Sequence, residues 1–206
     1  FSKDGRDWSA GVDVGDPDYW LWRVNWRGDT AYGIGYGTGD TRSTRLYSSK
    51  DGKSFDVLVP TLLEEGYTNE SALVFLEDGR CLCLLRRDVY GDAPCTGLIG
   101  SSEPPYVSWS WKDLGVRIGG PDLIRIPDGR FIATVRMYGD EENWGPAWTS
   151  ICEIDVDSGT ISETQRLPSG GDSSYAGMVW HEDQLWISYY SSHEEKTAIY
   201  LAHGMP

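Results

Sequence analysis

The segment LEDGRCLCLLRR (residues 76–87) decides the fold, because the segment IPDGRFIATVR (residues 126–136) repeats its layout. Each has a polar Asp-Gly-Arg turn, then a short apolar run that ends at an arginine, Arg86 in one and Arg136 in the other. The two segments are about 50 residues apart, a spacing typical of repeat architectures. An arginine at the end of a buried strand is costly unless an anion or a carboxylate meets it. The repetition therefore predicts a recurring structural unit whose arginines need partners.

Two further segments show the same order of apolar stretch, tight turn and second apolar stretch. They are YWLWRVNWRGDTAYGIGY (residues 19–36) and AGMVWHEDQLWISYY (residues 176–190). The chain thus has four expected hairpins, with turns near Gly28, Gly79, Gly129 and Asp183. Each hairpin is followed by further strand-like sequence, which makes about four strands per repeat. Four-stranded meanders repeated in this way are typical of β-propeller blades.

We therefore expect an all-β chain that forms a single β-propeller domain (1–206) of about four four-stranded blades. The repeats fall roughly at residues 17–60, 61–115, 116–168 and 169–206. The last repeat has three strand-like pieces, and residues 1–16 are expected to add the strand that closes it. The alternative is that these residues belong to a larger propeller. The chain lacks convincing amphipathic helices, which argues against helical and α/β repeats.

Composition narrows the range of partners. The chain has 32 acidic and 18 basic residues and a formal net charge of −14, so nucleic acid and membranes are poor partners. No apolar run reaches the roughly 18 residues of a membrane span. The four cysteines form no disulfide framework, and the three histidines have no paired spacing for a metal. We expect neither a metal nor a cofactor.

The segments SKDGRDW (residues 2–8) and SKDGKSF (residues 49–55) repeat a different turn. The Asp side chain is expected to accept backbone amide hydrogen bonds, Gly to take a positive φ, and the aromatic residue to pack on the sheet. This turn resembles the Asp-box of bacterial neuraminidase (BNR) repeats, which implies a structural role.

The innermost strand of each blade runs beside the central axis, so equivalent positions on these strands are expected to converge on one axial pocket. Counting from the turns, these positions hold Tyr36, Arg86, Arg136 and Tyr190. Two guanidinium groups directed at one place suit a carboxylate ligand. The alternative is that Arg86 and Arg136 each pair with a local carboxylate, such as Asp88 or Asp140.

Three segments resemble the sialidase (neuraminidase) superfamily. They are NESALVFLEDGRCLCLLRR (residues 69–87), GGPDLIRIPDGRFIATVR (residues 119–136) and GGDSSYAGMVW (residues 170–180). The resemblance implies that Tyr175 is the nucleophile, that Glu70 accepts its proton, and that Arg86 and Arg136 hold the carboxylate of a sialic acid. Arg23 would replace the third arginine of that family. The resemblance also favours a secreted or periplasmic location.

The pattern departs from that family in two respects. The family fold has six blades, and no acid/base aspartate is matched. The expected function is therefore the recognition of an anionic glycan, with hydrolysis of sialic-acid-type glycosides as the family activity. One alternative is a non-catalytic carbohydrate- or protein-binding propeller. Another is a propeller glycosidase that uses two carboxylates and in which the arginines are structural.

The tryptophans divide into two groups. Trp20, Trp22 and Trp26 alternate along one strand, as do Trp109 and Trp111, so packing between blades is expected. Trp144 and Trp148 are the candidates for stacking on a sugar.

Overall fold

A computed structural model describes residues 1–139 and 146–206 and shows fifteen strands in four sheets. The first sheet contains β1 (Tyr19–Arg27), β2 (Thr30–Gly37), β3 (Thr44–Ser49) and β4 (Asp56–Leu63). The second contains β5 (Tyr67–Phe75), β6 (Cys81–Asp88), β7 (Leu98–Ser102) and β8 (Ser110–Asp113). The third contains β9 (Gly119–Arg125), β10 (Phe131–Tyr138), β11 (Ala147–Asp155) and β12 (Thr160–Arg166). The fourth contains β13 (Ser174–His181), β14 (Gln184–Glu194) and β15 (Lys196–Gly204).

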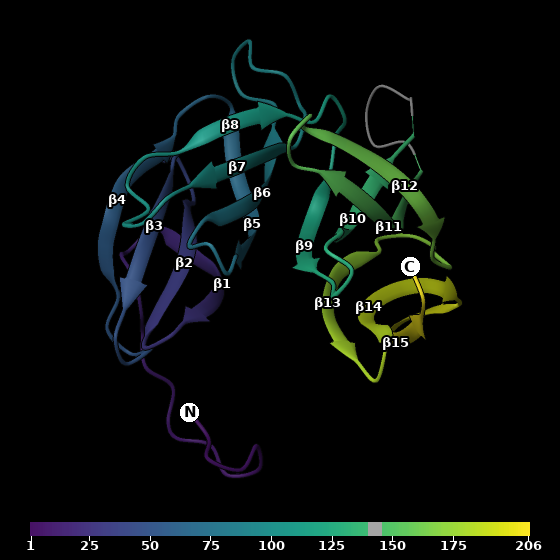
Figure 1. The fold of residues 1–206 in the computed structure, drawn as a ribbon, viewed down its shortest axis with the longest axis horizontal. Coiled ribbons are helices and arrows are strands. Elements are labelled where there is room, and N and C mark those ends of the chain that lie inside the picture. The colour runs from purple at the N-terminus through teal and green to yellow at the C-terminus, as the bar shows by residue number, and fades with distance from the viewer. Residues whose placement is uncertain (140–145) are drawn as a thin grey trace.

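The strands of each sheet follow chain order and pair antiparallel, as in propeller blades (Figure 1). The predicted four-bladed all-β propeller is confirmed, although the last blade has three strands. The described residues contain no helix, and hence no helix that could cross a membrane.

The first strand of each blade lies nearest the axis. β5 contacts both β1 and β9, and β9 contacts β13. Sequence counting had placed the strands that carry the arginines at the axis, and this was wrong. Arg86 and Arg136 lie on β6 and β10, the second strands, near the strand ends. They reach the axial region from those ends.

The Asp-Gly-Arg turns account for the repeated hairpins. Asp78 accepts a hydrogen bond from the backbone N–H of Arg80 (3.0 Å) and another from its Nε (2.9 Å). Asp128 does the same for Arg130, at 3.0 and 2.8 Å. Gly79 adopts a φ of 106°, which a residue with a Cβ rarely adopts. The same local chemistry therefore builds the same turn in two blades.

Packing between neighbouring blades forms three apolar cores. The first and second blades share a core around Ile34, Leu46 and Leu85, and the second and third share one around Leu84 and Val135. The third and fourth share a core around Ile132, Ile151 and Ile187. None of the three cores joins the first blade to the fourth, although side chains of β1 and β13 are in contact (Figure 1).

Residues 1–16 do not close the last blade. Within residues 1–139 and 146–206, the only bridge of this segment joins Ser2 to Trp8, and β15 pairs only with β14. The predicted turn is present, since Asp4 accepts the backbone amides of Arg6 (2.8 Å) and Asp7 (3.0 Å). Trp8, however, is 70% exposed, so it does not pack on a sheet as expected. The matching turn at Asp51 has the same pair of amide hydrogen bonds.

Candidate functional site

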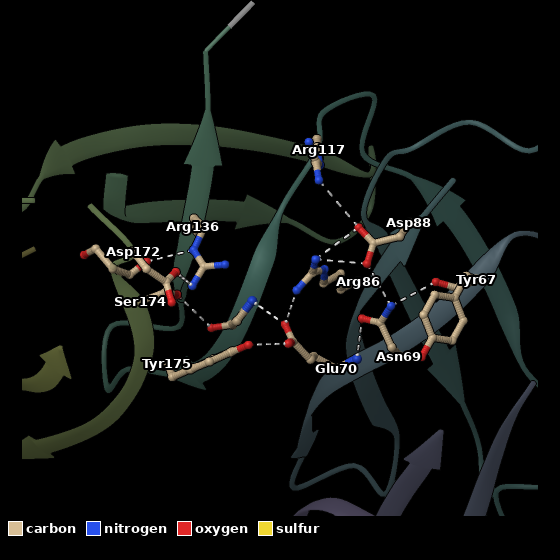
Figure 2. Close-up of polar contacts among 12 residues, drawn as sticks. Tyr67, Asn69, Glu70, Arg86, Asp88, Arg117, Arg136, Asp172, Ser174 and Tyr175 are labelled. Atoms are coloured by element: carbon tan, nitrogen blue, oxygen red, sulfur yellow. Dashed lines mark hydrogen bonds and ion pairs between the residues drawn. The ribbon is translucent and has the colours of Figure 1, made fainter. Parts of the chain in front are cut away.

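Side chains from three blades meet at one end of the axis, beside a cavity of about 750 Å³ (Figure 2). The cavity is lined by Arg86, Arg136, Tyr138, Pro146, Ala147, Ser169, Gly170, Gly171, Asp172 and Tyr175. Four of the five predicted site residues lie at or beside this cavity. Arg23 is the exception.

Glu70 is the centre of the site and is 5% exposed. Its Oε2 accepts hydrogen bonds from Arg86 Nη1 (2.9 Å) and from the backbone N–H of Gly120 (2.7 Å), and its Oε1 accepts one from Tyr175 Oη (2.7 Å). Each donor comes from a different strand: β6, β9 and β13. Glu70 therefore connects three blades at the axis.

Gly120 can reach Glu70 because it has no side chain. Its φ is +53°, and a Cβ at this position would lie 2.4 Å from Ser174 Oγ and 2.8 Å from Tyr175 Cδ1. Because both contacts are far below van der Waals distance, only glycine allows the backbone N–H to approach the carboxylate so closely.

Arg86 is held between two carboxylates. Besides Glu70, it pairs through Nη2 with Asp88 (2.9 Å), and Asn69 donates a hydrogen bond to the same carboxylate (3.0 Å). Burial disfavours the charged guanidinium, but the two carboxylates outweigh this and raise its pKa. The structure therefore shows the alternative in which Arg86 pairs with a local carboxylate, Asp88. The next residue along β6, Arg87, points elsewhere and pairs with Asp113.

Arg136 also has local partners. Its Nε donates to the backbone carbonyl of Ser173 (2.8 Å), and its Nη2 donates to Tyr190 Oη (2.9 Å) and contacts Asp172 Oδ1 (2.6 Å). Asp172 was not expected from the sequence. Asp140, the partner that was suggested, lies outside the described residues.

Tyr175 combines an uncommon backbone with a protonated hydroxyl. Its φ is 46°, in the left-handed region that non-glycine residues rarely adopt. Burial and the adjacent Glu70 carboxylate raise the pKa of its hydroxyl to about 12. Near neutral pH the hydroxyl is therefore a hydrogen-bond donor to Glu70. The structure brings the two predicted catalytic residues into contact, and their action on a substrate stays a prediction.

Arg23 is not part of the cavity wall. Its Nη2 donates to the backbone carbonyl of Ala176 (2.6 Å), and its Nη1 lies 3.4 Å from Asp122 Oδ1. Asp122 also accepts the backbone N–H of Met178 (2.9 Å). Burial raises the pKa of Asp122, and the charge of Arg23 opposes this shift. This second carboxylate near the axis was missed, although it is the aspartate of the quoted GGPD segment.

Aromatic rings lie next to the polar cluster. Tyr175 contacts Tyr190 (ring centroids 5.7 Å apart) and Trp22 (5.3 Å). Trp22 in turn contacts Tyr36 (6.1 Å) and Trp20 (5.4 Å). The four equivalent positions predicted to converge, including Tyr36 and Tyr190, therefore do lie around one site.

Of the two tryptophans suggested for sugar stacking, only Trp148 lies in the part of the chain that the structure describes. Trp144 lies outside the described residues. Trp148 donates to Glu163 and is covered by the guanidinium of Arg166, 3.6 Å from the ring centroid. Among the described residues, no group of three or more His, Cys, Asp and Glu side chains could hold a metal ion.

No family model and no curated protein matches the chain, but solved structures share its fold. A protein of unknown function from Dyadobacter fermentans has a TM-score of 0.74 at 16% identity, over 100% of this chain and 63% of that one. A GH43B protein from Bacteroides ovatus has a TM-score of 0.63 at 16% identity, over 92% and 39%. An endo-1,4-β-xylanase from Bacteroides thetaiotaomicron has a TM-score of 0.65 at 13% identity, over 90% and 69%. The chain thus spans less than two thirds of the first two proteins.

These neighbours correct the family prediction. They include glycoside hydrolases of family GH43, and the sialidase resemblance is wrong. The sialidase, neuraminidase and Asp-box (BNR) attributions fall with it, although the predicted turn geometry is present. At 11–16% identity the likeness shows a shared propeller fold.

Proposed function

We propose that the chain binds a neutral glycan, with one sugar unit in the axial cavity. The observation that carries this proposal is the charge balance of the cavity. Arg86 already pairs with Glu70 and Asp88, and Arg136 pairs with Asp172. An anionic sugar would have to displace these carboxylates, whereas a neutral sugar would not. The ligand expected from the charge balance is therefore a glycan without a carboxylate, in place of the anionic sugar expected from the sequence.

The chemistry of the cavity suits hydroxyl groups. Carboxylates such as Asp172 accept hydrogen bonds from sugar hydroxyls, and guanidinium groups such as Arg136 donate to them. The ring of Tyr175, which is 41% exposed, offers an apolar face to the C–H groups of a pyranose. A cavity of about 750 Å³ lies in the usual size range of small-ligand sites. Several structural neighbours are named for carbohydrates, including xylan and β-1,3-galactotriose.

Calorimetric titration tests this proposal with xylose, xylotetraose, galactose and β-1,3-galactotriose, and with N-acetylneuraminic acid as the anionic sugar. We expect binding of at least one neutral sugar and none of the anionic one. Arg136→Met should weaken this binding, because it removes cavity donors. The matched control is Arg80→Met, which changes an exposed arginine at a distant turn. Absence of binding throughout the panel, or preference for the acid, would overturn the proposal.

Hydrolysis is a second candidate, favoured by two carboxyl groups near the axis in unlike surroundings. Glu70 accepts three hydrogen bonds, whereas burial raises the pKa of Asp122. Glycoside hydrolases commonly use one carboxylic acid and one carboxylate. Turnover of aryl xyloside, galactoside or arabinoside substrates, lost in both Glu70→Gln and Asp122→Asn, would support it. Absence of turnover by the wild type on all of these would leave binding as the activity.

A further inference from the structure

We propose that Trp20 forms a stacking platform for a second sugar unit, so that the ligand is an oligosaccharide that leaves the cavity over the first blade. This inference rests on the proposed function and deepens it. The indole of Trp20 is 56% exposed, although tryptophan is the side chain with the largest apolar area to hide. An exposed indole that is connected to a polar cavity through one other ring calls for a ligand-based explanation.

Ring contacts connect Trp20 to the cavity without a break. The ring of Tyr175 lines the cavity and contacts Trp22 at 5.3 Å, and Trp22 contacts Trp20 at 5.4 Å with an interplanar angle of 72°. Tyr36 supports Trp20 from the neighbouring strand, at 5.9 Å. A continuous row of aromatic rings thus extends from the cavity to the exposed surface of β1.

Interblade packing was the sequence-based expectation for Trp20, and the structure contradicts it. The three apolar cores contain neither Trp20 nor its neighbour Trp22. Tyr36, which is paired with Trp20 across the two strands, is only 8% exposed. The edge contact with Trp22 and the tilted contact with Tyr36 therefore hold the indole in place while leaving over half of its surface in water.

The chemistry of this surface fits a neutral sugar ring. One face of a pyranose carries mainly C–H groups and loses little when it is taken out of water onto an indole. Its hydroxyls point outward and stay hydrated. A rigid aromatic side chain that is already ordered also costs little conformational entropy on binding.

The test compares chain lengths by calorimetric titration. Trp20→Ala should weaken the binding of xylotetraose or β-1,3-galactotriose about tenfold, while leaving xylose or galactose within about twofold. Trp20→Phe should recover most of the loss. The matched control is Trp26→Ala, which removes an equally exposed indole (52%) at the far end of the same strand and should change neither.

Each outcome decides a different proposal. Unchanged oligosaccharide binding in Trp20→Ala, or an equal loss for both chain lengths, would overturn the platform while the cavity proposal stands. Absence of all sugar binding in the wild type would overturn the cavity proposal instead. Sedimentation velocity adds a check. Self-association of the wild type that Trp20→Ala abolishes would make the indole a contact between copies and overturn the platform.

Discussion

Replacement of Glu70 by alanine should destabilise the fold strongly. Glu70 and its partner Arg86 are both largely buried, with side chains 7% and 12% exposed. Removing one member of a buried ion pair typically costs about 3–5 kcal/mol, because the other charge is left without compensation. Arg86 keeps its contact with Asp88, so we expect the lower part of that range for the guanidinium. The orphaned backbone N–H of Gly120 adds about 1 kcal/mol, which brings the expected loss to about 4 kcal/mol.

Denaturant unfolding followed by tryptophan fluorescence measures this loss as a change in the unfolding free energy. A double-mutant cycle with Arg86→Met separates the pair from its surroundings. Because the methionine leaves no charge for Glu70→Ala to strand, the double variant should lose at least about 1 kcal/mol less than the sum of the single variants. Asp172→Ala is the matched control. It breaks an ion pair whose carboxylate is 73% exposed, and it should cost under about 1 kcal/mol.

Two results would refute this reasoning. A loss of less than about 1 kcal/mol in Glu70→Ala would mean that water replaces the carboxylate as partner of Arg86. Strict additivity in the cycle would mean that Glu70 and Arg86 are not energetically coupled, whatever their separation of 2.9 Å.

Three further predictions concern the frame of the site. Gly120→Ala should lower the free energy of unfolding by over about 2 kcal/mol, because the new Cβ would clash with Ser174 and Tyr175. The control Gly115→Ala has a φ of +69° but open space around it, so it should lower that free energy by only the backbone strain of about 1 kcal/mol. Equal losses in the two variants would show that the contacts at Gly120 relax. Burial raises the pKa of Asp122 in the folded state, so the protonated carboxyl group stabilises the fold. This stabilisation is fully present below about pH 3.8, the ordinary pKa of Asp, and is lost as the pH rises through the pKa of the folded state. Unfolding at about pH 3 and pH 7 should therefore show Asp122→Asn gaining stability relative to wild type with rising pH, and the opposite trend would contradict this. By thermal unfolding, Ile187→Ala should cost about 2–4 kcal/mol and Ile199→Lys under about 0.5 kcal/mol, since the two side chains are 1% and 77% exposed; a large loss in Ile199→Lys would show that this face is covered.

The strand pattern could be predicted because it depends on local chemistry. The Asp78 and Asp128 turns and their flanking apolar runs specify hairpins within a dozen residues. The prediction that residues 1–16 close the last blade was wrong, because such a pairing with β15 would be a contact between distant parts of the chain that no local pattern specifies. The sequence predicts that β15 is the outer strand of its blade, but it does not show which segment, if any, pairs with its free edge.

The site was predictable in position but not in partnership. Glu70, Arg86, Arg136 and Tyr175 were expected to converge, and they do. The sequence could not show that Asp172, 36 positions after Arg136, neutralises it, because that pairing depends on how two blades meet. The family prediction was wrong for the same reason. The sequence does not show the carboxylate partners of Arg86 and Arg136, and two arginines without known partners resemble a clamp for an anionic ligand.

The repeated arginines can now be explained without an anionic ligand. Both follow an apolar run on the second strand of a blade, so both guanidinium groups emerge where the strand reaches the cavity. There, each meets a carboxylate from its own or the next blade, which removes the cost of bringing positive charge to a shared axis. Arg86 joins Glu70 of β5, and Glu70 joins Tyr175 of β13. Arg136 thus joins the third blade to the fourth through Ser173 and Tyr190, whereas Arg86 acts through Glu70, so both arginines have a structural role that needs no anionic ligand.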